Sequence, residues 1–336
     1  MICVPGSIPN IILSLTNFLK ALISYKYINL LIRALIGLAA FVFIAVKLYA
    51  YFKSTSFELL KMNEIQFHLL FIALLLVVIN WGTEAVKWKY LIRKLAPISL
   101  KKAFNLVITG ITIGLITPNR IGEIPARVFL LPNITNKKAL LTATFIGAFS
   151  QLLVTVFTGF IAIYFYKNEV FFSSFSFSIR IFILICLIGL IYSYFFPFWI
   201  TNLLKKIPFL SKNEHLVFSP LFSKEEKLNA LVMSIFRYAV FSFQYYLVLE
   251  AFGVHFNSFS EIALIAVCFL FTSVIPTFVL SEIAVRGSVA LFVFSFLSPN
   301  DFAIFSASLV LWLLNVALPA TIGIFGLTKI QFPKKA

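Results

Sequence analysis

Three charged residues stand close together in the stretch TPNRIGEIPARVFLL: Arg120, Glu123 and Arg127. On a helix, Glu123 and Arg127 lie four residues apart on one face, in the order that favours an ion pair. Arg120 has no such partner nearby in the chain. If a helix restarts near Gly122, its free backbone amides and Arg120 together suit an anion such as phosphate. The stretch therefore predicts an anion site.

The chain around this motif is strongly apolar. Of its 336 residues 61% are hydrophobic and only 12% are charged, whereas a soluble domain carries about 25% charged residues. Six apolar runs approach or exceed the roughly 20 residues with which a helix crosses a bilayer: residues 34–52, 67–81, 139–166, 179–198, 230–249 and 302–328. We therefore expect an all-α polytopic membrane protein with about six full spans.

The net charge of +16 resides mainly in short loops between these runs. This distribution marks a cytoplasmic face under the positive-inside rule and argues against a nucleic-acid partner. With the basic residues of 20–33 and 87–102 on that face, both termini are expected in the cytoplasm. Residues 1–33 are expected to form an N-terminal interfacial segment.

Two further apolar runs are too short to cross a bilayer, and each ends at a proline. Residues 103–117 precede Pro118, and residues 261–275 precede Pro276. A helix of about 15 residues reaches only about 22 Å, so we expect two broken, re-entrant hairpins. Glu282 follows the second proline and is four residues from an arginine, as in the first motif.

The order of these segments predicts an inverted repeat. The single transmembrane domain, residues 1–336, divides into the halves 34–166 and 179–328, each with two spans, a hairpin and a span. An odd number of spans between the hairpins inverts one relative to the other. Transporters with this architecture bind their substrate near the membrane midplane, between broken helices.

Two interpretations of the charged pairs remain open: they are salt bridges that hold the hairpins in place, or they line a polar cavity. We favour the cavity, because an ionisable residue at the bilayer centre costs roughly 2.5–3.5 kcal/mol and usually marks a functional site. The candidate binding residues are Thr117, Arg120, Glu123, Arg127, Glu282 and Arg286. Pro118, Gly122, Pro276, Gly110 and Gly114 are candidate structural residues, the last two as a G-x-x-x-G that permits close helix approach.

Other polar residues carry no recognisable chemistry. Glu84 and Lys87 fit interface anchoring beside Trp81, and Arg237 fits a side chain that snorkels to the membrane surface. The histidines and cysteines are scattered, so no metal site or cofactor is expected. No catalytic constellation selects a reaction, which favours a protein that is not an enzyme but leaves an intramembrane transferase open, in which Glu123 and Glu282 could serve.

At the charged motif the chain resembles the transmembrane region of lysylphosphatidylglycerol synthases, a flippase-like domain shared with many small membrane proteins. The segment is similar to the family's T-P-G-R-x-G-E motif, with Asn119 in place of the usual glycine. The resemblance runs over essentially the whole chain in order but includes no aminoacyltransferase domain, so it does not imply lysyl transfer. It carries over Thr117, Pro118, Arg120, Gly122, Glu123 and Arg127, and Pro276 and Glu282 in the second segment.

The resemblance implies a protein of the bacterial cytoplasmic (inner) membrane that moves an anionic, aminoacylated or polyprenyl-linked lipid between the leaflets. Arg120 and Arg286 would contact the head group, and Glu123 and Glu282 would orient these arginines or respond to protons. Two alternatives remain: a non-transporting accessory protein that binds a lipid-processing enzyme, or an intramembrane glycosyl- or phosphotransferase. In each case membrane lipids are the expected partners.

Overall fold

The computed structural model describes Val46 and residues 65–115, 117–131, 136–165, 177–196, 222–277 and 279–328. Every regular element in these residues is helical, which confirms the all-α class. Four helical runs are long and apolar enough to cross a membrane: Phe67–Ile92, Lys137–Ile163, Lys224–Ala251 and Asp301–Gly326. The N-terminal segment and the expected first span, apart from Val46, lie outside the described residues.

The described part of the chain contains a series of helices. In chain order they are α2 (Phe67–Ile92), α3 (Leu100–Leu115), the 3-10 turn η3 (Pro118–Arg120), α4 (Glu123–Phe129), α5 (Lys137–Phe165), α7 (Phe177–Phe195), α10 (Lys224–Ala251), α11 (Phe259–Val274), α12 (Val279–Phe294), α13 (Asp301–Trp312), the π-helical segment η5 (Leu313–Ala317) and α14 (Leu318–Thr328). The last expected span, residues 302–328, is therefore helical throughout but interrupted by a π segment.

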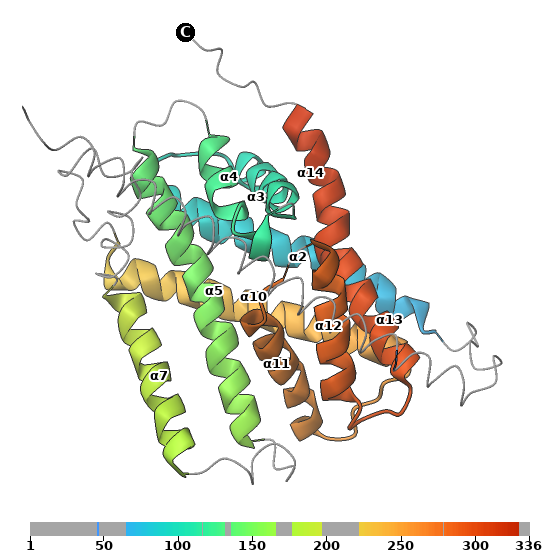
Figure 1. Ribbon diagram of the computed structural model, residues 1–336. Coiled ribbons are helices and arrows are strands. Elements are labelled where there is room, and N and C mark those ends of the chain that lie inside the picture. The colour runs from blue at the N-terminus through green and yellow to red at the C-terminus, as the bar shows by residue number, and fades with distance from the viewer. Residues whose placement is uncertain are drawn as a thin grey trace, which may run out of the picture.

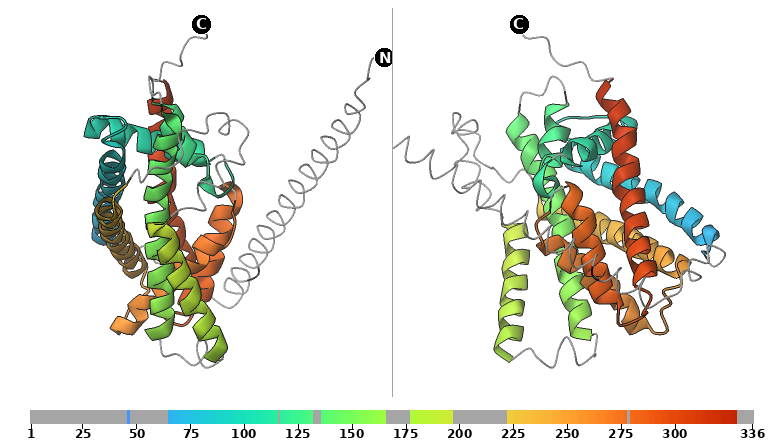
Figure 2. Two further views of the ribbon diagram at one scale, coloured as in Figure 1. Left: turned by 90° about the vertical axis from the view of Figure 1, so that its left-hand side faces the viewer. Right: turned by 45° about the vertical axis from the view of Figure 1, so that its right-hand side comes forward.

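Helices α2 and α10 run antiparallel and side by side along one face of the molecule (Figures 1 and 2). At one end Gln66 N donates to Ala251 O at 3.1 Å. At the other end Arg93 and Lys94 lie 2.7 and 2.9 Å from Glu226 Oε1. The basic loop after α2 and the start of α10 are thus at the same end of the molecule.

The first hairpin comprises α3, η3 and α4, and its break depends on small residues. Thr117 Oγ1 donates to Gly114 O at 2.7 Å and accepts from Gly122 N at 2.9 Å, which closes the turn. The chain then restarts as α4, with Gly122 at its N-cap. A Cβ atom on Gly110 would lie 3.0 Å from Arg127 Cγ, so the glycines expected to permit close approach do so against α4.

The second hairpin comprises α11 and α12, and its tip meets the tip of the first. Helix α11 ends before Pro276, as expected, and α12 packs back against it. Asn119 N donates to Thr277 O at 2.9 Å, and Thr277 N donates to Asn119 Oδ1 at 2.5 Å. Figure 1 shows α3 and α4 toward one end of α5, and α11 and α12 toward the other. The two helix breaks therefore meet between the ends of the bundle.

Helix α14 fixes the first hairpin from the other side by close packing on α3. Thr112 Oγ1 donates to Ala320 O at 2.8 Å. Gly323 faces the same helix so closely that a Cβ atom there would lie 2.6 Å from Ile108 O. A helix pair with this approach requires a residue without a side chain at the contact.

Candidate functional site

A single carboxylate, Glu84 on α2, binds three basic side chains. Its Oε1 accepts from Arg127 Nη1 of α4 at 2.7 Å. Its Oε2 lies 2.9 Å from Lys87 Nζ and 3.2 Å from Arg237 Nη1 of α10. We call these four residues, together with Glu123, the Glu84 cluster, because Arg127 also pairs with Glu123 through Nη2. The cluster joins the first hairpin to both long antiparallel helices.

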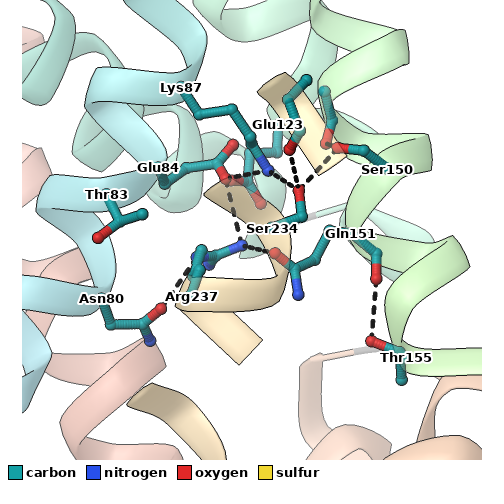
Figure 3. A network of polar contacts seen from close by, with 12 residues as sticks. Asn80, Thr83, Glu84, Lys87, Glu123, Ser150, Gln151, Thr155, Ser234 and Arg237 are labelled. Carbon is teal, nitrogen blue, oxygen red and sulfur yellow. Dashed lines mark hydrogen bonds and ion pairs between the residues drawn. The ribbon is translucent and has the colours of Figure 1, made fainter. Parts of the chain in front are cut away.

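Neutral side chains complete this buried network (Figure 3). Lys87 Nζ donates to Ser234 Oγ on α10 at 3.1 Å, and Ser234 Oγ lies 2.7 Å from Ser150 Oγ on α5. The Lys87 side chain is only 1% exposed. Since a buried ammonium without partners is very costly, the carboxylate of Glu84 and the hydroxyl of Ser234 are what allow Lys87 to lie there.

The expected roles of Glu84, Lys87 and Arg237 were wrong. Helix α2 does not end near residue 81 but continues to Ile92, and α10 covers its polar face. These charged groups therefore form ion pairs inside the bundle instead of reaching the membrane surface. One signal in the sequence could have indicated this: Asn80, Glu84 and Lys87 lie four and three residues apart, which places them on one face of a helix.

A cavity of about 220 Å³ lies beside the Glu84 cluster. Three arginines from three different elements line it: Arg120 of η3, Arg237 of α10 and Arg286 of α12. The other lining residues are polar or aromatic for the most part: Asn80, Trp81, Gln151, Thr155, Tyr238, Phe241, Phe269, Thr272, Ser273, Leu311, Trp312, Asn315 and Val316. Among the described residues no carboxylate belongs to this lining. The volume is below the roughly 300–1,000 Å³ of a drug-sized site and suits a small polar group.

The three arginines differ in how far their charge is compensated. Arg286 is paired with Glu282, whose Oε1 lies 3.0 Å from both Nε and Nη2. Arg237 Nε donates to Asn80 Oδ1 at 2.9 Å, and its guanidinium shares Glu84 with two other cations. Arg120 Nε and Nη2 are buried and have no acceptor among the described residues. The least compensated charge therefore belongs to Arg120.

Of the five buried side-chain atoms that line this cavity without a hydrogen-bond partner in the described residues, four can only donate, and the fifth, the hydroxyl of Tyr238, can donate or accept. Besides the two Arg120 nitrogens, Nε1 of Trp81 and Nε1 of Trp312 are buried without an acceptor in the described part of the chain. The backbone of Arg120 has φ +57°, a left-handed conformation that a non-glycine residue rarely adopts. An unfavourable conformation that directs an unpaired guanidinium into a cavity is typical of functional sites.

A chain of amides supports the wall of the cavity opposite the hairpins. Asn80 Nδ2 donates to Asn315 Oδ1, and Asn315 Nδ2 donates to Gln244 Oε1, both at 2.9 Å. Asn315 lies in the π-helical segment η5, and such segments are frequent at functional sites. These amides connect α2 and α10 to the last helical run and hold Arg237 in its orientation.

The candidate binding residues identified in the sequence lie in three different places in the structure. Arg120 and Arg286 line the cavity, and Glu282 lies behind Arg286. Glu123 and Arg127 belong to the adjacent Glu84 cluster. The hydroxyl of Thr117 forms the turn that presents Arg120. Within the described residues no three His, Cys, Asp or Glu side chains lie close enough together to hold a metal ion.

These features define a multi-pass helical membrane protein with an arginine-lined internal cavity. The chain matches the family described as lysylphosphatidylglycerol synthase TM region over residues 30–329, and it belongs to that family. The family places it among membrane proteins linked to lipid synthesis or translocation. Neither the curated proteins nor the solved structures gave a match.

Proposed function

We propose that the protein binds the phosphate of a membrane lipid head group in the arginine-lined cavity and moves that lipid between the leaflets of the bacterial inner membrane. The observation that carries this proposal is the convergence of Arg120, Arg237 and Arg286 on one cavity without a carboxylate in its described lining. Guanidinium groups present several donors in a planar fork that matches phosphate oxygens. A phosphate at this place would also accept from the unpartnered nitrogens of Arg120.

A second observation favours a lipid over a soluble anion. An apolar groove of about 640 Å³ is formed by α5, α7, α11 and α12. Its lining residues are Val156, Phe160, Ile163, Ile183, Leu270, Phe271, Val274, Ile275, Ser288, Val289 and Phe292. Helices α5, α11 and α12 also contribute to the polar cavity. In this proposal the charged head of an amphipathic ligand binds in the cavity and its hydrocarbon chain binds in the groove.

The proposed movement uses the two hairpins as gates. In the proposal the hairpins are re-entrant, and the halves 34–166 and 179–328 are related by inversion, as in transporters with alternating access. The hairpin tips are joined by the two hydrogen bonds between Asn119 and Thr277. Each such bond contributes about 1 kcal/mol net, so little free energy is needed to separate the two hairpin tips during a transport cycle.

The test is a leaflet-exchange assay in proteoliposomes of phosphatidylglycerol and phosphatidylcholine. A trace of phosphatidylglycerol with a fluorescent acyl chain is added, and dithionite quenches the label in the outer leaflet. We expect the wild type to expose the inner-leaflet label and Arg120→Gln to slow this by about tenfold or more, because charge-assisted hydrogen bonds are lost. Lys101→Gln, which removes an exposed charge at the start of α3, should behave as wild type.

Three outcomes would contradict the proposal. Equal rates for the wild type and a monodisperse Arg120→Gln variant would show that the cavity has no role in transport. A wild type that exchanges no lipid but co-purifies with a lipid-processing enzyme would support the accessory protein. Incorporation of label from an activated sugar or phosphate donor would support the transferase.

A further inference from the structure

We propose that the cavity selects a dianionic phosphate, as in a phosphomonoester or a diphosphate, and excludes head groups that carry an amine. This inference rests on the proposed function and narrows its substrate from phosphate-bearing lipids in general to one class. The family resemblance alone allows anionic, polyprenyl-linked and aminoacylated lipids as substrates. The inference retains the first two classes and excludes the aminoacylated lipids.

The charges around the cavity do not balance. The Glu84 cluster and the cavity wall bring together five basic side chains and three carboxylates. The basic residues are Lys87, Arg120, Arg127, Arg237 and Arg286, and the acidic residues are Glu84, Glu123 and Glu282. The described residues of the site thus carry an excess of two positive charges. In a medium of low dielectric constant, an excess of this kind is costly unless a ligand of opposite charge balances it.

The excess positive charge lies on side chains that reach the cavity. Arg286 and Glu282 form a neutral pair, so they contribute nothing to it. In the Glu84 cluster three cations share two carboxylates, and of these cations Arg237 lines the cavity. The remaining charge is that of Arg120, which lines the cavity with two unpartnered nitrogens. Both uncompensated charges can therefore meet a single ligand, and two negative charges on that ligand balance them.

The cavity is unfavourable for a head group that carries an amine. An ammonium group in the cavity would need a carboxylate, and the described lining has none. Two neutral acceptors of the lining already take part in hydrogen bonds, since Asn80 Oδ1 accepts from Arg237 and Asn315 Oδ1 accepts from Asn80. The hydroxyl of Tyr238, unpartnered among the described residues, is a neutral acceptor and does not balance a positive charge. An ammonium group would also face the repulsion of three guanidinium groups at short range. The cavity therefore disfavours a lysyl ester or an ethanolamine head group, because the ammonium group has the same sign of charge as the arginines.

The experiment compares three lipids with identical dioleoyl chains. Phosphatidic acid carries roughly −1.5 to −2 charges at pH 7, like other phosphomonoesters, whereas phosphatidylglycerol carries a single negative charge and lysylphosphatidylglycerol is a net cation. Equimolar mixtures are added to the delipidated protein in detergent, and bound lipid is counted by native mass spectrometry. We expect phosphatidic acid to exceed phosphatidylglycerol by about tenfold, as one further charge-assisted hydrogen bond provides, and lysylphosphatidylglycerol to bind least.

A charge variant tests the origin of the preference. Gln151 Oε1 lies 3.4 Å from Arg237 Nη1, so Gln151→Glu places a carboxylate in the lining with almost no change of shape. We expect the ratio of phosphatidic acid to phosphatidylglycerol to fall toward one and lysylphosphatidylglycerol binding to rise. Arg120→Gln, which also removes one positive charge, should lower the same ratio if the first variant does not fold. Lys101→Gln should leave it unchanged.

The outcomes separate this inference from the proposed function. Equal binding of the three lipids, still abolished by Arg120→Gln, would overturn the selectivity and leave lipid binding in the cavity intact. Binding that is insensitive to Arg120→Gln would overturn both. Displacement of phosphatidic acid by millimolar inorganic phosphate or glycerol 3-phosphate would assign the site to a soluble phosphate and overturn the lipid head group as its ligand.

Discussion

At the scale of single residues, Glu84 couples the first hairpin to the long helices through one carboxylate. Its oxygens contact Arg127 of α4 and Arg237 of α10, and Lys87 of its own helix. Arg237 lines the cavity, whereas Glu84 does not. Glu84 therefore influences the position of a cavity-lining guanidinium without lining the cavity itself. We assign Glu84 a positioning role on this geometry.

Replacement of Glu84 by Gln should destabilise the protein by about 3–5 kcal/mol, because three buried cations would lose their shared counter-charge. Thermal unfolding of the detergent-solubilised protein measures the effect. Glu225→Gln is the matched control, since Glu225 is exposed at the start of α10 and its loss should change stability by less than about 0.5 kcal/mol. Equal unfolding temperatures for the two variants would show that Glu84 is not the centre of the network.

Much of the site was predictable at the residue scale, and the part that was missed has a common cause. Arg120 and Arg286 were identified because each follows a proline that breaks an apolar run. Glu84 and Arg237 lie in unbroken helices, where one charged residue in the sequence is equally compatible with the membrane surface and with the interior. Only the packing of α10 on α2 decides between these, and that contact is between residues far apart in the chain.

At the scale of elements, the prolines and glycines determine where the hairpins break and how closely they pack. Helix α3 ends just before Pro118 and α11 just before Pro276, close to the ends expected from sequence. The partner of α3 was not predictable, because α14 follows it by some two hundred residues and its glycines resemble those of any apolar helix. Contact with α14, together with the contacts to α2 and α4, holds α3 against the bundle.

This contact predicts a contrast between two glycine variants. A Cβ atom on Gly323 of α14 would lie 2.6 Å from Ile108 O, a backbone atom that cannot move aside alone, whereas Gly189 of α7 has nothing within 4 Å. Gly323→Ala should therefore destabilise the protein by about 1–3 kcal/mol through overpacking. Gly189→Ala should leave stability unchanged or raise it by about 0.5–1 kcal/mol through helix propensity. Thermal unfolding in detergent compares the two, and a loss for Gly189→Ala as large as that for Gly323→Ala would refute the role of the contact.

At the scale of the whole molecule, charged residues just after α2 and at the start of α10 meet at one end of the bundle. Arg93 and Lys94 meet Glu226 there, and Lys227 Nζ donates to Phe195 O at 2.7 Å, which adds the end of α7 to the same group. Gln66 and Ala251 meet at the opposite end. The charge distribution expected from the positive-inside rule is thus compatible with the three-dimensional arrangement, which favours one orientation of the bundle in a membrane.

That orientation predicts opposite accessibility for two exposed positions, Lys102 at the start of α3 and Asn257 between α10 and α11. In a variant whose native cysteines are replaced by serine, a membrane-impermeant maleimide should label Asn257→Cys in intact spheroplasts and Lys102→Cys only after permeabilisation. The physical reason is that the lysine- and arginine-rich end is retained in the cytoplasm while the other end is translocated. The reverse labelling pattern would show that the bundle has the opposite orientation in the membrane. Labelling of both positions from outside would mean that one of the two long antiparallel helices does not cross the membrane, and alternating access through two opposed hairpins would then have to be abandoned.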